Sequence, residues 1–350
     1  MHHLKEEPRL VAWEATAACN LACVHCRAEA QTEPDPDELT TAEVKRLIDQ
    51  IAEFASPIFI ITGGEPMLRE DVYEIAAYAS ERGLKPVMSP NGTLLTPETV
   101  QKIKEAGVSR ISVSLDGSSA EKNDSFRMVP GAFDAAVRGL EHARRGGLPF
   151  QINTTVTRRN LDDLEAMFRT VVDLGAVGWD VFMLVPTGRG KIEDEVAPEE
   201  YERVLNWIYD LSKEAPIPVK VTCGPHYQRI SRLRDKEERL VGPPGHPAGG
   251  ARRRSPGCMG GRGFCFVSRV GEVYPCGYLP VSAGNVRETH FREIYQGSEL
   301  FRELRDVDRL KGKCGRCEFR RVCSGCRARA YGAYGDYMAE EPYCTYEPRV

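Results

Sequence analysis

The sequence lacks the features that would direct a protein to a membrane or to nucleic acid. Its longest apolar stretches, such as PIFIIT at 57–62, are far too short to span a bilayer. The opening residues, MHHLKEEPRL, contain no apolar core of a signal peptide, so we expect a cytoplasmic protein. A formal net charge of −4 gives no overall field that favours nucleic acid or an anionic membrane. These absences predict a chain with no membrane span and no nucleic-acid partner.

Cysteine, by contrast, is abundant, with 12 residues in a chain of 350. A reducing compartment disfavours structural disulfides, so close-set cysteines predict ligands for a metal or a cluster. Eleven of the 12 fall in two blocks, 19–26 and 258–344, and only Cys223 stands alone. A lone cysteine is more often a small buried hydrophobic residue than a ligand.

Six short apolar runs alternate with helical patterns along the first part of the chain. The runs predict strands at 11–16, 57–62, 85–90, 110–115, 150–156 and 179–185. The patterns between and after them predict helices at about 40–54, 70–82, 96–107, 131–145, 161–174 and 198–213. The first helix opens on a capping box formed by Thr40 and Glu43. This alternation predicts an α/β fold with a parallel sheet, either partly closed into a barrel or open and doubly wound.

The unusual motifs come just after the predicted strands. Cys19 follows the first strand, GGEP at 63–66 the second and NG at 91–92 the third, while Ser114 and Asp116 end the fourth. Both architectures place their chemistry at the C-terminal ends of parallel strands. We therefore expect these motifs to gather at one edge of the sheet.

The character of the sequence changes after residue 215. We expect a barrel at 1–215, a linker or bridging region at 216–257 and a cysteine-rich domain at 258–350. The bridging region includes a Pro/Gly/Arg-rich stretch that is typical of a linker.

The first cysteine block, CNLACVHC, offers three thiols at Cys19, Cys23 and Cys26. A structural zinc site needs four ligands, and His25 is poorly placed to share a metal with the adjacent Cys26. A four-iron cluster suits three thiolates, because its fourth iron then keeps an open position for a substrate or cofactor. This spacing after a first strand, with GGEP after the second, resembles the radical S-adenosylmethionine (SAM) enzymes.

The resemblance implies a partial (β/α)6 barrel of the TIM type, in which the three cysteines bind a catalytic [4Fe-4S] cluster and SAM binds its open iron. The SAM-derived radical would perform the chemistry, so no side chain is assigned as catalytic. GGEP would contact the amino group of SAM and Arg127 its carboxylate, with the other residues near its ribose and methionine portions or along its pocket. The implied SAM-binding residues are Gly63, Gly64, Glu65, Pro66, Asn91, Ser114, Asp116, Arg127, Asn153 and Leu184.

The second block holds eight cysteines between Cys258 and Cys344. Its CGRC and CSGC pairs alone would suit a zinc ribbon, but together with GEVYPC and the last cysteine they resemble a SPASM domain. That domain carries auxiliary [4Fe-4S] clusters, and the count here permits one or two. By resemblance one cluster is held by Cys258, Cys265, Cys276 and Cys326, and the other by Cys314, Cys317, Cys323 and Cys344. The last interval is x2 where the family usually has x3.

Longer strings such as TCGPHYQR and KGKCGRCEFRRVCSGCRARAYG resemble the heme b synthases of the siroheme-dependent heme pathway. The resemblance implies oxidative decarboxylation of two propionates of Fe-coproporphyrin III to vinyl groups, with an electron donor such as ferredoxin or flavodoxin. Arg189, Lys191, Arg229 and residues 252–254 are candidates for contacts with the substrate carboxylates. His226 and Tyr227 are candidates for contacts with the porphyrin or its iron, or for a structural role.

Three other functions stay open at this point. The first is a sister enzyme that acts on didecarboxysiroheme or on the precursor of a d-type heme. The second is a SPASM peptide or sulfatase maturase, although only ten residues precede the first predicted strand and leave no peptide-binding domain there. The third is a zinc-stabilised binding module, which would not explain GGEP.

Overall fold

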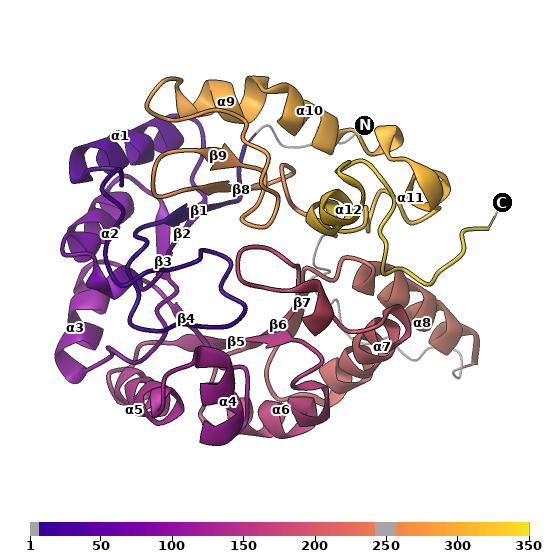
Figure 1. Cartoon of the computed structure of the whole chain (residues 1–350), viewed down its shortest axis with the longest axis horizontal. Coiled ribbons are helices and arrows are strands. Elements are labelled where there is room, and N and C mark those ends of the chain that lie inside the picture. Colours follow the sequence, from indigo (N-terminus) through magenta and orange to yellow (C-terminus); the bar gives the residue numbers. More distant parts are fainter. Residues whose placement is uncertain (1–6, 242–256, 350) are drawn as a thin grey trace.

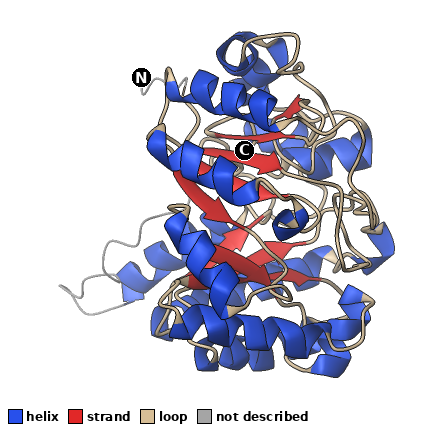
Figure 2. Cartoon of the chain, turned by 90° about the vertical axis from the view of Figure 1, so that its left-hand side faces the viewer, coloured by secondary structure: helices blue, strands red, loops and turns tan. Residues whose placement is uncertain are grey.

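Strands form the middle of the molecule and helices surround them (Figures 1 and 2). The computed structural model describes residues 7–241 and 257–349. The sheet has the order β7-β6-β5-β4-β3-β2-β1-β8-β9, with parallel pairing from β7 to β8 and antiparallel pairing between β8 and β9. The strands are β1 (Leu10–Glu14), β2 (Ile58–Thr62), β3 (Lys85–Met88), β4 (Ile111–Ser114), β5 (Phe150–Val156), β6 (Trp179–Met183), β7 (Val219–Thr222), β8 (Phe264–Val267) and β9 (Val273–Tyr274).

The helices lie outside the sheet and in the C-terminal part of the chain. They are α1 (Thr41–Ala52), α2 (Val72–Glu81), α3 (Pro97–Glu105), α4 (Ala120–Arg127), α5 (Ala132–Arg145), α6 (Leu164–Asp173), α7 (Pro198–Glu214), α8 (Tyr227–Val241), α9 (Phe291–Gly297), α10 (Glu299–Arg305), α11 (Gly312–Arg316) and α12 (Arg327–Tyr334). Within the described ranges, no helix has both the length and the apolar character needed to cross a membrane.

The predicted α/β fold is confirmed, with the six predicted strands at β1 to β6. Helix starts follow local signals: Thr40 and Glu43 form the capping box of α1, and Thr96 caps α3 with Pro97 in its first turn. The sequence AEKNDSFR of α4 was not predicted as a helix, because its apolar content is too low to show a periodic pattern.

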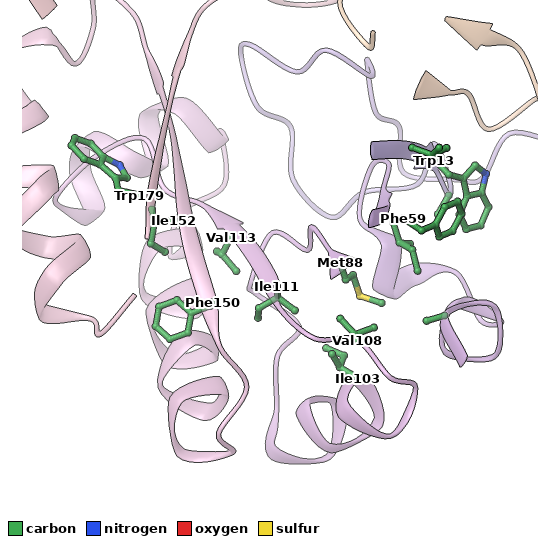
Figure 3. Packing of buried hydrophobic residues seen from close by; sticks show 14 of the residues in the cluster. Trp13, Phe59, Met88, Ile103, Val108, Ile111, Val113, Phe150, Ile152 and Trp179 are labelled. Atoms are coloured by element: carbon green, nitrogen blue, oxygen red, sulfur yellow. The ribbon is translucent and has the colours of Figure 1, made fainter. Parts of the chain in front are cut away.

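Alternate residues of β4 and β5 pack against the helices and form part of the core. Val113 and Ile152 are fully buried there, and Figure 3 shows them in line with Trp13, Met88 and Trp179. The residues in between face away from the helices and stay partly exposed. They include Ser112, Ser114, Gln151 and Asn153, so the inner face of the barrel is polar.

The region expected to be a linker contributes to the barrel instead. Residues 216–257 include β7, which pairs in parallel with β6, and α8, which packs on α7. At the other end of the sheet, β8 of the cysteine-rich part pairs with β1. One sheet therefore crosses the predicted domain boundaries. Residues 242–256, among them the predicted substrate contacts 252–254, lie outside the described residues.

Candidate active site and auxiliary cluster sites

The three-cysteine loop begins at the C-terminal end of β1 and is closed at its base by backbone hydrogen bonds. Cys19 N donates to Gln31 O at 2.7 Å, and Gln31 N donates to Ala17 O at 3.0 Å. The thiols of Cys19, Cys23 and Cys26 are free and partly exposed. The base of the loop is thus fixed while its thiols remain accessible.

GGEP packs directly against the first residues of that loop. Gly64 N donates to Thr16 O and Glu65 N donates to Ala18 O, each at 2.7 Å. A Cβ on Gly64 would lie 2.2 Å from Ala18 O, and one on Gly63, whose φ is +148°, would lie 2.8 Å from Thr16 O. Glycine is therefore required here because two backbone segments approach closely.

Glu65 connects GGEP to the NG turn that follows β3. Its carboxylate accepts hydrogen bonds from Asn91 N at 2.6 Å and Met67 N at 3.0 Å. Asn91 Nδ2 donates to Asn20 Oδ1 at 2.7 Å and lies 3.9 Å from Cys19 Sγ. Burial raises the pKa of Glu65 to about 7, although both N–H donors lower it. The motifs after β2 and β3 therefore meet beside the cysteine loop.

A buried ion pair supports another part of the loop. Arg127 Nη2 donates to Asp116 Oδ2 at 2.5 Å, and Arg127 Nη1 donates to Cys23 Sγ at 3.5 Å. His25 Nε2 lies 3.2 Å from the same Asp116 oxygen, and Thr155 N donates to the other at 2.7 Å. Burial favours the neutral carboxyl, but Arg127 and His25 lower the pKa of Asp116 to about 2. Arg127 thus has two protein partners, and its binding of the SAM carboxylate stays a prediction.

Arg189 holds the cysteine loop and is not placed as a free cation for a substrate. Its Nε donates to Cys23 O and its Nη1 to Ala30 O, both at 2.9 Å. Its backbone N donates to Cys26 O at 3.0 Å. The expectation of a free cation for substrate carboxylates is therefore corrected in part: Nε and Nη1 bind loop carbonyls, while Nη2 is buried without a hydrogen-bond partner among the described residues. Lys191, its exposed neighbour, makes no such contact in the described structure.

Of the remaining predicted SAM residues, two lie on the inner face of the barrel and two are buried. Ser114 and Asn153 lie opposite each other on β4 and β5, on the polar inner face. Pro66 is buried in the turn after β2. Leu184 is 5% exposed at the end of β6, and its carbonyl accepts a 2.7 Å hydrogen bond from Arg329 of α12. Of the two roles considered for Leu184, the structure favours packing.

The polar inner face also contains a charged pair that sequence reasoning missed. Asp180 on β6 lies in register with Asn153 on β5 and with Lys220 on β7. Lys220 Nζ is 2.9 Å from Asp180 Oδ2, and Thr222 Oγ1 donates to Asp180 Oδ1 at 2.7 Å. Asp180 raises the pKa of Lys220, so the ammonium stays charged. In the sequence, the one sign of this pair was a lysine between the β-branched residues of VKVT, a string that is typical of a strand.

The donors of the first thiol set are those that an iron–sulfur cluster requires. In a four-iron cluster each thiolate binds a different iron. Leu21 N and Ala30 N each donate at 3.4 Å to the sulfurs of Cys19 and Cys26. Such N–H donors stabilise the thiolate form that iron requires.

One C-terminal thiol set lines a common cavity that is open to solvent. Its members are the four predicted ligands of one auxiliary cluster, Cys314, Cys317, Cys323 and Cys344. Glu341 N donates to Cys314 Sγ at 3.3 Å and Phe319 N to Cys317 Sγ at 3.4 Å. The donor set therefore fits the predicted cluster.

His226 and Arg229 line the same cavity. Both ring nitrogens of His226 and Nε of Arg229 are buried without a hydrogen-bond partner. Arg229 Nη2 also pairs with Glu202 at 2.5 Å. Unpartnered donors and a buried cation suit an anionic thiolate cluster. The predicted porphyrin contacts of His226 and Arg229 are therefore corrected to this thiol set, and Tyr227 begins α8 behind them.

Only part of the other predicted thiol set is assembled. A Cβ on Gly260 would lie 3.6 Å from Cys276 Cβ and 3.7 Å from Cys258 Sγ, which places these two cysteines side by side. Cys276 also packs on the apolar cluster that contains Cys326. Cys265 is separate, because β8 directs its side chain into the core of the barrel, where it is fully buried. Its predicted role as a ligand is not supported by this placement.

Comparisons with known proteins identify the two families that the chain matches. Residues 13–171 match the radical SAM superfamily, and residues 258–327 match the SPASM iron-sulfur cluster-binding domain. The AdoMet-dependent heme synthase of Methanosarcina barkeri is 55% identical over 97% of this chain and 97% of its own length. The Fe-coproporphyrin III synthase of the same organism is 35% identical over 97% of this chain and 88% of its own.

A solved structure shows the same fold. Streptococcus suis SuiB bound to S-adenosylmethionine matches with a TM-score of 0.74 over 97% of this chain and 78% of its own. The two sequences are 16% identical, so this likeness concerns the arrangement of the barrel and the C-terminal domain.

Proposed function

Because this chain belongs to the radical SAM superfamily and carries a SPASM domain, we propose that it converts two propionates of Fe-coproporphyrin III to vinyl groups and so forms heme b. The similarity to AdoMet-dependent heme synthases along nearly the whole chain carries this proposal. The cofactors of the enzyme are SAM, a catalytic [4Fe-4S] cluster and auxiliary iron–sulfur clusters of the SPASM domain.

Bound SAM supplies, on reduction, a 5′-deoxyadenosyl radical that takes a hydrogen atom from the propionate carbon next to the ring. The substrate then releases CO2 and one electron, and a vinyl group remains. Two propionates therefore require two SAM molecules and release two electrons. The C-terminal thiol sets provide ligands for an acceptor of these electrons.

The residues of the chain position the reactants. The cysteine loop would hold the catalytic cluster beside GGEP and Asn91, at the C-terminal ends of β1 to β3. Asp116 and Arg127 keep Cys23 in place, and Arg189, in the segment after β6, binds carbonyls of the loop. The polar side chains that β4, β5 and β6 present on the inner face suit a cofactor with ribose and amino acid groups.

Lys220 is our candidate for binding a substrate carboxylate. Its side chain lies on the inner face and is 56% exposed, while its partner Asp180 is 7% exposed. A fixed and accessible ammonium suits one of the four carboxylates of Fe-coproporphyrin III. The electron donor that we propose is a low-potential carrier of the ferredoxin or flavodoxin class.

Anaerobic incubation with Fe-coproporphyrin III, SAM and a low-potential reductant tests the proposal. We expect a product that has lost CO2 and two hydrogen atoms from each of two propionates, detected by mass spectrometry. Turnover of didecarboxysiroheme without turnover of Fe-coproporphyrin III would move the assignment to the sister reaction. Modification of a peptide without either porphyrin reaction would favour a maturase.

A further inference from the structure

We propose that Cys223 is the fourth protein ligand of the auxiliary cluster held by Cys258, Cys276 and Cys326. It takes the place that the resemblance to SPASM domains assigns to Cys265. This inference rests on the SPASM domain and its clusters and does not depend on the identity of the substrate.

Cys223 lies among the three thiols although it is distant from them in sequence. It follows β7, the last strand of the barrel, and packs with Cys276 on the apolar cluster that contains Cys326. Cys258 lies beside Cys276, so these contacts bring four thiols together at the end of β7. Four thiols form the donor set of a closed four-iron cluster.

Cys265 has neither the neighbours nor the space that a cluster needs. It pairs with Val11 across β8 and β1, and its exposed fraction is 0%. Cys223, Cys258 and Cys276 are each partly accessible. Cys326 is buried, but it belongs to the smaller apolar cluster of the C-terminal part, on which Cys223 and Cys276 pack. Cys265 instead belongs to the closely packed core of the barrel, which leaves no room for iron at its sulfur.

The backbone at Cys223 is held in a conformation that a buried hydrophobic residue would not need. Its φ is +59°, in the left-handed region that side chains other than glycine rarely adopt. Its carbonyl accepts hydrogen bonds from Tyr201 Oη at 2.8 Å and from Arg329 Nη1 at 3.3 Å. Strain of this kind persists where surrounding contacts enforce it, typically at functional positions.

The same contacts bring Cys223 and Cys326 together. Cys326 is the N-cap residue of α12, and Arg329 lies in the first turn of that helix. Arg329 is buried, pairs with Glu195 at 2.8 Å, and donates to carbonyls after both β6 and β7. Figure 1 shows α12 beside the end of β7. A cluster with Cys223 as a ligand therefore joins the barrel to the C-terminal domain.

The test uses the full chain with Cys19, Cys23 and Cys26 changed to alanine, so that all bound iron belongs to auxiliary clusters. Cys223→Ala and the matched control Cys265→Ala are introduced into this background. After anaerobic reconstitution, iron and sulfide per chain are measured together with Mössbauer spectra. We expect Cys223→Ala to lose about one iron per chain if a three-iron cluster remains, or about four if the whole cluster is lost. We expect Cys265→Ala to retain the full iron content.

Cys223→Ser provides a second readout that does not require loss of the cluster. Serine keeps the volume and offers an oxygen ligand, so we expect altered electron paramagnetic resonance g values for one auxiliary cluster. Full iron content with an unchanged spectrum in both Cys223 variants would overturn the proposal, as would iron loss confined to Cys265→Ala. These assays contain no porphyrin, so their failure and a failure of the decarboxylation proposal are separate results.

Discussion

The carboxylate of Glu65 accepts a 2.6 Å hydrogen bond from the backbone N–H of Asn91, and this contact joins the strand ends of β2 and β3. Asn91 in turn lies 3.9 Å from Cys19 Sγ. Glu65 is fully buried, and its pKa is raised to about 7 because burial disfavours the charged form. The edge at which we propose that SAM binds therefore depends on a carboxyl group whose pKa burial raises.

Glu65 should make the stability of the protein fall between about pH 4.5 and pH 7. The unfolded chain releases the proton of this carboxyl near its ordinary pKa of 4.5, and the folded chain releases it only near 7. The folded state binds more protons in this window, so Glu65 contributes roughly 3 kcal/mol to the free energy of unfolding below the window, and this contribution is lost as pH rises through it. In denaturant unfolding, the free energy of unfolding of Glu65→Gln should not show this decrease with pH.

The matched control for this measurement is Glu70→Gln. Glu70 is exposed on the same turn, so its variant should keep the pH profile of the unchanged chain. Parallel profiles for the unchanged chain and Glu65→Gln would contradict the assigned titration.

Asp116→Asn should destabilise both the fold and the cysteine loop. The substitution leaves Arg127 and His25 without their buried carboxylate, and loss of one partner of a buried pair typically costs about 3–5 kcal/mol. Asp162→Asn is the control, because the Asp162 side chain is 76% exposed and pairs with Lys122. We expect a lower unfolding midpoint and less catalytic iron for Asp116→Asn alone. Equal midpoints for the two variants would contradict the role of the pair.

Arg189→Ala should shorten the lifetime of the catalytic cluster and leave substrate affinity unchanged. The variant removes two hydrogen bonds to carbonyls of the cysteine loop, at Cys23 and Ala30. Absorbance decay in the presence of a chelator measures the lifetime, and Lys191→Ala is the exposed control. An unchanged lifetime with weaker porphyrin binding would restore the interpretation of Arg189 as a carboxylate ligand.

Lys220→Ala should weaken binding of Fe-coproporphyrin III by about tenfold, which corresponds to about 1.4 kcal/mol. The variant removes the accessible cation of the inner face, and Lys220→Arg should keep the affinity because it keeps the charge. Titration of the porphyrin absorbance gives the Kd, with Lys213→Ala on α7 as the control. The same Kd for Lys220→Ala and Lys213→Ala would remove Lys220 from the substrate site.

Features encoded in short spacings could be predicted from the sequence. The strands β1 to β6, the three-cysteine loop and GGEP depend on local patterns, and the structure brings Glu65, Asn91, Asp116 and Cys19 to one edge as expected. The four-thiol set from Cys314 to Cys344, which the resemblance to SPASM domains implied, lines one cavity.

Features that depend on contacts between distant segments could not be predicted. The strand β7 is four residues long, so Lys220 and Cys223 gave no pattern of their own. Cys265 has a plausible spacing to Cys258, but pairing of β8 with β1 turns its side chain into the core. The sequence suggested that Arg189 was available to a substrate carboxylate. Its partners are backbone carbonyls of a distant segment, and no spacing in the sequence indicates them.

Deuterium on the propionate carbon next to the ring of Fe-coproporphyrin III provides the most direct test of the proposed reaction. In an anaerobic reaction with unlabelled SAM, the account predicts heme b in which each new vinyl group has lost one deuterium atom. It also predicts that the 5′-deoxyadenosine formed carries this deuterium. Formation of 5′-deoxyadenosine without deuterium, together with unchanged Fe-coproporphyrin III, would contradict it.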